Sequence, residues 1–248
     1  MKIVITSVKN EKIKDLKKLH QRKYRKQTNT FLIEGEHLIE EALASDWTTT
    51  EIIVSEEASI PEPAKNLPVT EVTKQVFKEL SFTASPQGVM AVVEIKTEEA
   101  VNGELVVLLD AVQDPGNAGT IIRTADAAGA DSVILGSGCV DLYNDKVIRS
   151  TQGSIFHLPI LHADLEEEVD QLKEANYTVW ATALEQAENY KNLPVPSKTA
   201  VIFGNEGAGV KDSLLEKADE RVTIPIFGKA ESLNVSIAAG VLLYYLNN

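Results

Sequence analysis

Three loops, each directly after an apolar run, carry the residue types and spacings in this sequence that could do chemistry. They read QDPGNAGTIIR after LVVLLD, GNEGAGV after AVIF, and FGKAESLN after RVTIP. Clustered glycines let a backbone approach a ligand closely, and a carboxylate such as Glu206 in the second loop can orient an arginine or a hydroxyl. Each loop taken alone is equally consistent with a simple turn, so the interpretation depends on all three.

The first loop contains Asn117 and Arg123, which call for different explanations. Asn117 sits before a predicted helix and can cap its first turn through its side-chain oxygen, a structural role that is sufficient for it. Arg123 lies two turns into that helix, beside Ile121, Ile122 and Ala125. An arginine on so apolar a segment must either extend its charged end into water or meet an anion. Arg123 is therefore a candidate anion-binding residue.

The third loop ends in Ser232, Leu233 and Asn234, where a nearly all-apolar helix is predicted to begin. Ser232 alone would suffice to cap such a helix, so capping does not explain why Leu233 and Asn234 occupy its first turn. Their explanation has to come from the other two loops.

Regularly alternating elements position these loops from Glu104 onward. Helical patterns such as AGTIIRTADAAGA, DLEEEVDQLKEA and DSLLEKAD lie between several of the apolar runs LVVLLD, SVILG, HLPIL, YTVWATAL, AVIFG and RVTIPI. Continuous apolar strands separated by helices predict a parallel sheet covered on both faces. Ligands bind outside the carboxyl ends of the strands in such a sheet, which is where the three loops would lie.

Residues 1–95 predict a separate, smaller α/β domain. Helical patterns occur at NEKIKDLKKLH, EHLIEEALAS and TKQVFKELS, and strand patterns occur at TFLIEG, TEIIVSE and GVMAVVEI. The polar segment 96–103 is the predicted linker, and residues 104–248 form the predicted second, larger domain.

The charge of the chain is divided unevenly. The net charge is −13, but residues 1–30 carry ten Lys and Arg against Glu11 and Asp15, which gives +8 there and −21 elsewhere. A basic segment on an acidic body is typical of polyanion binding, although a solvated lysine-rich helix explains the same charges equally well. The candidate contacts to such a polyanion in this segment are Lys12, Lys17, Lys18, Arg22, Lys23 and Arg25.

Several other classes of protein are disfavoured. There is no dinucleotide fingerprint, Walker motif, HExxH zinc motif or GxSxG nucleophile elbow. Cys139 is the single cysteine and the four histidines are scattered, so neither a disulfide nor a metal site is expected. No apolar run approaches the roughly 18 residues of a membrane span, and the start of the chain does not read as a signal peptide. A cytoplasmic protein is expected.

The three loops together, in this order and spacing, resemble the three motifs of the SpoU family of RNA ribose 2′-O-methyltransferases. The matching segments are DPGNAGTIIRTADAAGA, IFGNEGAGV and IPIFGKAESLNVSIAAG, and the matching signature residues are Asn117, Arg123, Glu206, Ser232 and Asn234. The resemblance covers roughly residues 104–248. Residues 1–95 more loosely resemble the ribosomal-protein-like α/β substrate-binding domain that precedes the catalytic domain in many members.

The resemblance implies a fold, a cofactor and a site. The fold is the SPOUT α/β sheet with a deep C-terminal trefoil knot, and the site is completed by the second subunit of a homodimer. S-adenosylmethionine would be held by Gly204, Ile224, Leu233, Asn205, Ile226 and Ala183. Asn117 and Glu206 would fix the guanidinium of Arg123, which binds an RNA phosphate and orients the 2′-hydroxyl. Ser232 and Asn234 would hold the loop and the incoming ribose, and no metal is required.

The resulting interpretation is methylation of a ribose 2′-hydroxyl in ribosomal RNA, with transfer RNA as the alternative substrate. A separate N-terminal domain favours the structured ribosomal target. The sequence does not exclude a resistance methyltransferase that protects the ribosome from an antibiotic. A non-catalytic RNA-binding ribosome-assembly protein is disfavoured by the intact signature residues. A nucleotide-dependent oxidoreductase is disfavoured by the missing dinucleotide fingerprint.

Overall fold

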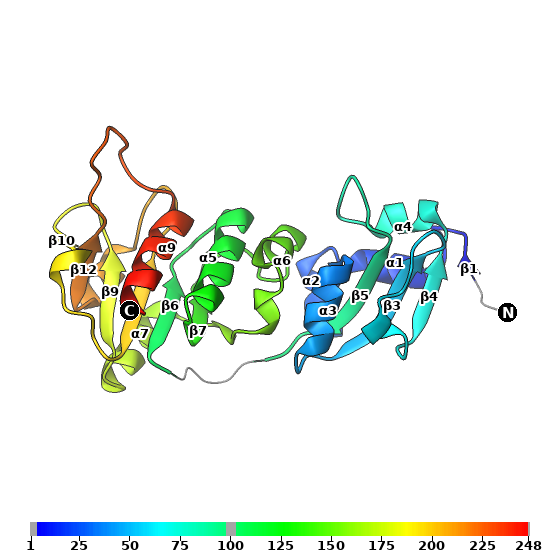
Figure 1. Ribbon diagram of the computed structural model, residues 1–248, viewed down its shortest axis with the longest axis horizontal. Coiled ribbons are helices and arrows are strands. Elements are labelled where there is room, and N and C mark those ends of the chain that lie inside the picture. The colour runs from blue at the N-terminus through cyan, green and yellow to red at the C-terminus, as the bar shows by residue number, and fades with distance from the viewer. Residues whose placement is uncertain (1–3, 98–102, 248) are drawn as a thin grey trace. The chain divides into compact units, whose positions relative to one another are not determined.

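The computed structural model describes residues 4–97 and 103–247, which fold into two compact units (Figure 1). The first unit comprises residues 1–96 and 141–156, and the second comprises residues 97–140 and 157–248. Residues 98–102, the greater part of the predicted linker, lie outside the described residues.

The first unit is built on a mixed five-stranded sheet. Its strand order is β1 (Val4–Ile5), β4 (Val69–Val72), β3 (Thr49–Ser55), β5 (Val89–Glu94) and β2 (Thr30–Glu34). β1 and β3 pair parallel with β4, whereas β2 and β3 pair antiparallel with β5. The sequence predicted β2, β3 and β5 but not the short strands β1 and β4.

The predicted helices of the first unit are confirmed, and two more occur. The helices are α1 (Glu11–Lys18), α2 (Arg22–Thr28), α3 (Glu36–Ala44), α4 (Lys74–Leu80) and α6 (Asp145–Thr151), with short 3₁₀ turns at Glu62–Ala64 and Ser154–Phe156. Ile13, Leu16 and Leu19 are buried against Phe77 and Leu80, as their helical spacing predicts. α2 and α6 were not predicted, because neither shows a clear apolar stripe.

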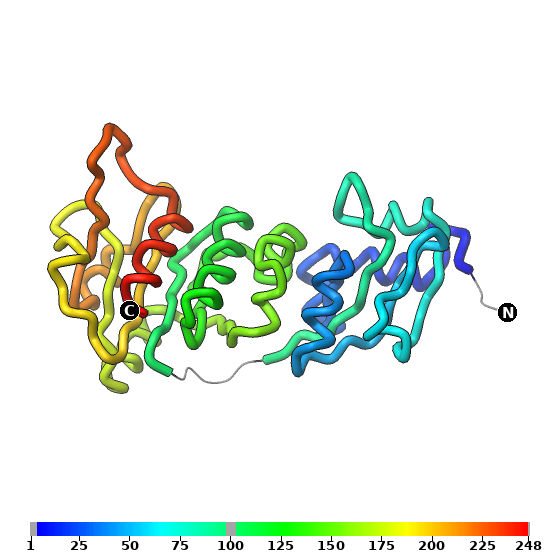
Figure 2. The backbone as a smooth tube through the Cα atoms, in the orientation of Figure 1, coloured from blue at the N-terminus to red at the C-terminus, as the bar shows by residue number. Residues whose placement is uncertain are grey.

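Residues 141–156 belong to the first unit although they follow β7 in the chain (Figure 2). Tyr143 packs on Phe31 at 4.7 Å between ring centroids, and Phe156 meets Trp47 edge-on at 5.5 Å. The first unit therefore includes residues 141–156, a segment that lies within the predicted domain of residues 104–248. Of these aromatic side chains, Phe31 and Phe156 are buried, whereas Tyr143 and Trp47 are partly exposed.

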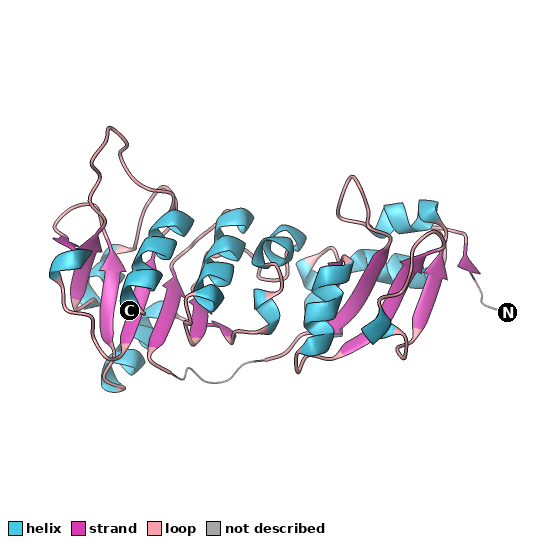
Figure 3. Cartoon of the chain, viewed as in Figure 1, coloured by secondary structure: helices cyan, strands magenta, loops and turns pink. Residues whose placement is uncertain are grey.

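The second unit contains a seven-stranded sheet in which every pairing is parallel (Figure 3). The strand order is β10 (Glu188–Asn189), β12 (Glu220–Thr223), β9 (Thr178–Thr182), β11 (Thr199–Phe203), β6 (Leu105–Leu109), β7 (Ser132–Leu135) and β8 (Ile160–His162). The predicted parallel sheet is confirmed. Only the two-residue β10 has no counterpart in the sequence pattern.

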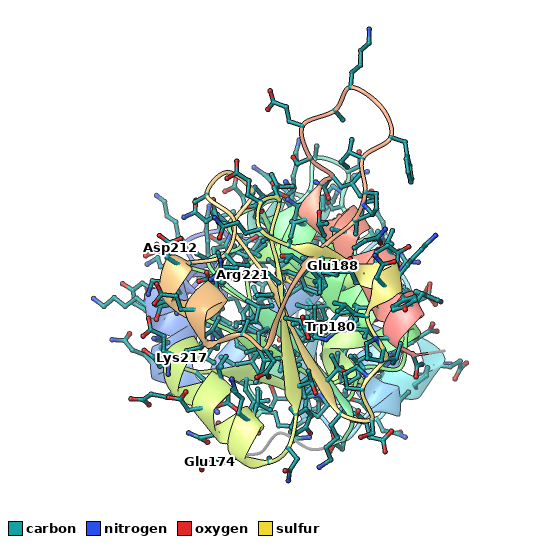
Figure 4. The ribbon with its side chains drawn as sticks, turned by 90° about the vertical axis from the view of Figure 1, so that its left-hand side faces the viewer. Glu174, Trp180, Glu188, Asp212, Lys217 and Arg221 are labelled. Atoms are coloured by element: carbon teal, nitrogen blue, oxygen red, sulfur yellow. The ribbon has the colours of Figure 1, made fainter. Side chains whose placement is uncertain are left out.

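Helices cover both faces of this sheet (Figure 4). α5 (Pro115–Ala127) and α9 (Val235–Leu246) pack together on one face, and α7 (Leu165–Glu174) and α8 (Asp212–Lys217) pack together on the other. A 3₁₀ turn at Tyr190–Asn192 precedes β11. Val169, Leu172 and Leu214 fill the core between the sheet and α7 and α8. Within the described residues, no helix has the length and hydropathy that a membrane crossing requires.

Candidate active site

The candidate site lies at the carboxyl ends of β6, β9, β11 and β12, which are neighbours in the sheet. Because these strands are all parallel, the loops that follow them emerge at one edge. The loop after β6 begins at Asp110, the loop after β11 at Gly204, and the loop after β12 at Ile224. The topology thus brings together the three loops that the sequence singled out.

Glu206 ties the second loop to the first. One of its carboxylate oxygens accepts from the backbone N–H of Asp114 and from the Asn117 Nδ2 group, both at 3.0 Å. The other oxygen accepts from the backbone N–H of Gln113 at 3.2 Å. The carboxylate is therefore fully engaged with the turn before α5.

Asn117 and Asn234 extend this connection to the third loop. Asn234 Nδ2 donates to Asn117 Oδ1 at 2.9 Å, while Asn117 Nδ2 donates to Glu206. Asn234 Oδ1 in turn accepts from the N–H and the hydroxyl of Ser236, at 2.9 and 2.6 Å. A single chain of hydrogen bonds, from Glu206 through Asn117 to Asn234, therefore fixes the three loops to one another.

Two predictions about helix capping are wrong. α5 is capped by Asp114, which accepts from Asn117 N at 2.9 Å, so that Pro115 takes the first helical position, which suits proline. α9 begins at Val235 and is capped by Asn234, so Ser232 and Leu233 lie in the preceding loop. Asn117 is therefore free to link Glu206 and Asn234, because it has no capping role.

The pKa of Glu206 reflects these contacts. Partial burial by itself raises the pKa, but hydrogen bonds from Asn117 and from the N–H groups of Asp114 and Gln113 outweigh it and lower the pKa below its ordinary value. The carboxylate is thus held charged at neutral pH, which keeps both oxygens available as acceptors.

Glu206→Gln should lower the free energy of unfolding by about 1 kcal/mol at pH 7, because an amide offers one acceptor oxygen where the carboxylate offers two. A group whose pKa is lowered by folding stabilises the fold above its unfolded-state pKa and loses this contribution as pH falls through the folded value. Denaturant titrations should therefore show the difference from wild type narrowing below about pH 4. A difference that does not depend on pH would contradict this role for the charge.

The second loop folds tightly on itself. Asn205 Oδ1 accepts from the N–H groups of Gly207 and Ala208 at 2.9 and 3.0 Å, and its Nδ2 donates to the carbonyl of Ala111 at 2.8 Å. A Cβ atom on Gly204 would lie 2.1 Å from the carbonyl carbon of Gly209. The sequence interpretation assigned the clustered glycines to ligand approach, but Gly204 is required by the loop's own backbone.

A cavity of about 880 Å³ opens at this edge of the sheet. Its lining includes all six residues predicted to bind the cofactor, Gly204, Ile224, Leu233, Asn205, Ile226 and Ala183. Three of the five predicted catalytic residues, Glu206, Ser232 and Asn234, line it as well. The volume is in the range of cavities that hold small-molecule ligands.

The cavity also has lining residues that sequence reasoning missed. They are chiefly Thr182 at the end of β9, Leu184, Glu185 and Gln186 in the loop after it, and Arg221 and Thr223 on β12. Since β9 was predicted and neighbours both β11 and β12, the loop after it could have been included on topology alone. Sequence reasoning took only Ala183 from this loop, through the family resemblance, because the loop contains no glycine cluster.

Arg123 is exposed on α5 and is not among the residues that line the cavity. Within the part of the chain that the structure describes, its guanidinium has no hydrogen bond or ion pair. The expectation that Glu206 and Asn117 fix this guanidinium is therefore wrong for the single chain, because both side chains are already engaged in linking the loops.

The predicted RNA contacts fall into different classes. Arg25 is only 6% exposed and pairs with Asp141, so its assignment to RNA is wrong. The other predicted contacts are all exposed. Of these, Lys12, Lys17 and Lys18 have the acidic partners Glu51, Glu79 and Asp15, whereas Arg22 and Lys23 have no acidic partner among the described residues.

Comparisons with known proteins match both units of the chain to known protein families. Residues 104–244 match the SpoU rRNA Methylase family, and residues 10–91 match the MRM3-like substrate binding domain. The 23S rRNA (guanosine(2553)-2′-O)-methyltransferase RlmP of Bacillus subtilis (strain 168) is 48% identical over 98% of both chains.

Solved structures give the same picture. An AdoMet-bound rRNA methyltransferase from Sinorhizobium meliloti aligns with a TM-score of 0.88 and 32% identity, covering 98% of this chain and 97% of the other. The SpoU methyltransferase AviRb from Streptomyces viridochromogenes, in complex with AdoMet, aligns with a TM-score of 0.85 and 27% identity, covering 96% and 97%. The similarity to each solved structure therefore extends over nearly the whole length of both proteins compared.

Proposed function

The chain belongs to the SpoU rRNA methylase family, and on that premise we propose that it transfers a methyl group from S-adenosylmethionine to a ribose 2′-hydroxyl of 23S ribosomal RNA. The Bacillus subtilis relative is named for guanosine 2553 of that RNA, and the similarity extends through the substrate-binding unit. The corresponding guanosine is the proposed target. The activity is placed in the cytoplasm, where ribosomal RNA is found.

The charge of the cavity is the observation that carries the choice of cofactor. Among the described residues that line it, Glu185, Glu206, Asp212 and Glu231 are acidic, and Arg221 is the one basic side chain. S-adenosylmethionine carries a sulfonium and an ammonium group against a single carboxylate, so an acidic cavity suits it. A dinucleotide with a pyrophosphate would meet repulsion here and would find no glycine fingerprint to bind it.

The residues present can be assigned roles in this reaction. When bound, S-adenosylmethionine supplies an electrophilic methyl group, and Ile224, Ile226 and Leu233 would hold its apolar part. Arg123 would bind an RNA phosphate and orient the 2′-hydroxyl, because its planar guanidinium can donate two parallel hydrogen bonds to one phosphate. The hydrogen bonds between Asn117 and Asn234 keep the loops in place while the ribose is held. No metal ion is proposed.

A homodimer is part of this proposal. Arg123 is exposed and lies outside the lining of its own cavity, which favours a site completed by the Arg123 of a second subunit. Ile237 and Tyr244 of α9 are 56% and 57% exposed, and they offer an apolar surface for the contact. A knotted C-terminus is proposed as well, from the membership of the SpoU family; the hydrogen bond from Tyr245 to the carbonyl of Leu193 shows only that α9 lies beside the segment between β9 and β11.

The proposed function is tested by transfer of labelled methyl groups. The purified chain, mixed with S-adenosylmethionine, should label 23S rRNA and leave transfer RNA at background. Label found only in transfer RNA would show that transfer RNA, and not ribosomal RNA, is the substrate. A chain that binds RNA but transfers no label to any RNA would instead be the non-catalytic assembly protein.

A further inference from the structure

The basic residues near the start of the chain separate into two groups. Nine of them lie within the described residues, and five of these have an acidic partner: Lys12, Lys14, Lys17, Lys18 and Arg25. The other four are exposed and have no ion pair with any described residue: Lys9, Arg22, Lys23 and Lys26. Three of these four belong to α2, and every basic residue of α1 belongs to the paired group.

The three exposed cations of α2 share one side of the helix. Arg22, Lys23 and Lys26 fall within an arc of about 100° at 3.6 residues per turn. Arg25 lies outside this arc and is buried, where its Nη1 donates to the carbonyl of Leu19 at 2.7 Å and its Nη2 binds Asp141. The inward arginine thus anchors the helix, and the outward side carries only positive charge.

The two helices differ in the net charge that they present to a polyanion. α2 reads RKYRKQT and contains no carboxylate. On α1, Lys14 and Lys18 are paired with Glu11 and Asp15 of the same helix. A lysine already paired with a carboxylate adds no net charge to its surface, so it attracts a phosphate less than an unpaired one does.

We infer that α2, rather than α1, binds the phosphate backbone of the RNA substrate, through Arg22, Lys23 and Lys26. The inference rests on the proposed function, because RNA is the polyanion that the function requires. It narrows a basic segment of 30 residues to one face of a seven-residue helix.

The test compares two matched triple variants. One carries Arg22→Ala, Lys23→Ala and Lys26→Ala, and the control carries Lys12→Ala, Lys17→Ala and Lys18→Ala. Each removes three cations from a helix, and alanine maintains helix propensity. The dissociation constant for a 23S rRNA fragment is measured across a range of salt concentrations. Each lost phosphate contact lowers the slope of the logarithm of affinity against the logarithm of salt concentration by roughly 0.7–0.9. The slope should therefore fall by about 2–3 in the α2 variant and by less than about 1 in the control.

A control that loses as much slope as the α2 variant, or more, would overturn the inference. The single variants Arg22→Ala, Lys23→Ala and Lys26→Ala should each lower the slope by about one contact, so the test does not depend on the triple variant folding. Affinity for S-adenosylhomocysteine should match wild type in all of them. A wild-type chain that neither binds S-adenosylhomocysteine nor methylates RNA would refute the proposed function itself, independently of these slopes.

Discussion

Arg123→Lys and Arg123→Ala should each reduce methyl transfer by about 10² or more, the scale of a lost acid–base or electrostatic group. Lysine keeps the charge but cannot reproduce the planar fork that grips a phosphate while orienting a hydroxyl. The guanidinium has no partner among the described residues of its own chain, so neither change removes a contact that holds the fold. The measurement is the single-turnover rate on 23S rRNA.

Folding and cofactor affinity serve as controls for the Arg123 variants. Both should stay near wild type, because Arg123 is exposed and does not line the cavity. A lysine variant with near-normal turnover would remove Arg123 from the reaction.

The shared site of the proposed homodimer can be examined with the same variant. Arg123→Ala subunits mixed with subunits that cannot bind the cofactor should recover part of the activity, since mixed dimers contain one complete site. No recovery, with mixed dimers confirmed by co-purification of differently tagged subunits, would show that Arg123 acts at the site of its own chain.

Gly204→Ala should weaken binding of S-adenosylhomocysteine by about tenfold to 100-fold. The added Cβ would lie 2.1 Å from the carbonyl carbon of Gly209 and 2.2 Å from the nitrogen of Val210. Backbone cannot move aside as a flexible side chain can, so the loop must shift, and overpacking of this kind typically costs 1–3 kcal/mol. Because Gly204 and Gly209 both line the cavity, the shift deforms the site that calorimetry would titrate.

Gly207→Ala is the matched control for Gly204→Ala. Gly207 lies in the same loop as Gly204, but a Cβ atom on Gly207 would meet nothing nearer than Asn205 Oδ1 at 3.7 Å. Its affinity should stay within a few-fold of wild type. Equal losses in the two variants would show that the loop tolerates no added methyl group anywhere, and the steric account of Gly204 would fail.

Much of the fold was predictable, because its signals are local and repeated. Ile13, Leu16 and Leu19 follow helical spacing, and continuous apolar runs mark buried parallel strands. The three loops could be placed at one edge because all strands of a parallel sheet point the same way. The residues predicted to bind the cofactor followed from the family resemblance, and all six of them line one cavity.

The rest depends on partners distant in the chain, which no local pattern reveals. Arg25 looks like any exposed cation of a basic helix until Asp141, 116 residues later, is seen to pair with it. Asn117 looks like a cap until the position of Asp114 in the turn excludes it. Glu206 was predicted to hold the guanidinium of Arg123, because both are signature residues. In the structure the Glu206 carboxylate instead accepts hydrogen bonds from the backbone of the first loop.

The most direct test of the whole account is a map of ribose methylation on 23S rRNA after incubation with the purified chain and S-adenosylmethionine. Alkaline cleavage spares the bond after a 2′-O-methylated nucleotide, so a single new protected position reports both the reaction and its target. The account predicts one protected guanosine, equivalent to position 2553 in the RNA of the Bacillus subtilis relative, and none with Arg123→Ala. Methylation on a base instead of a ribose, or no protected position with active cofactor binding, would contradict it.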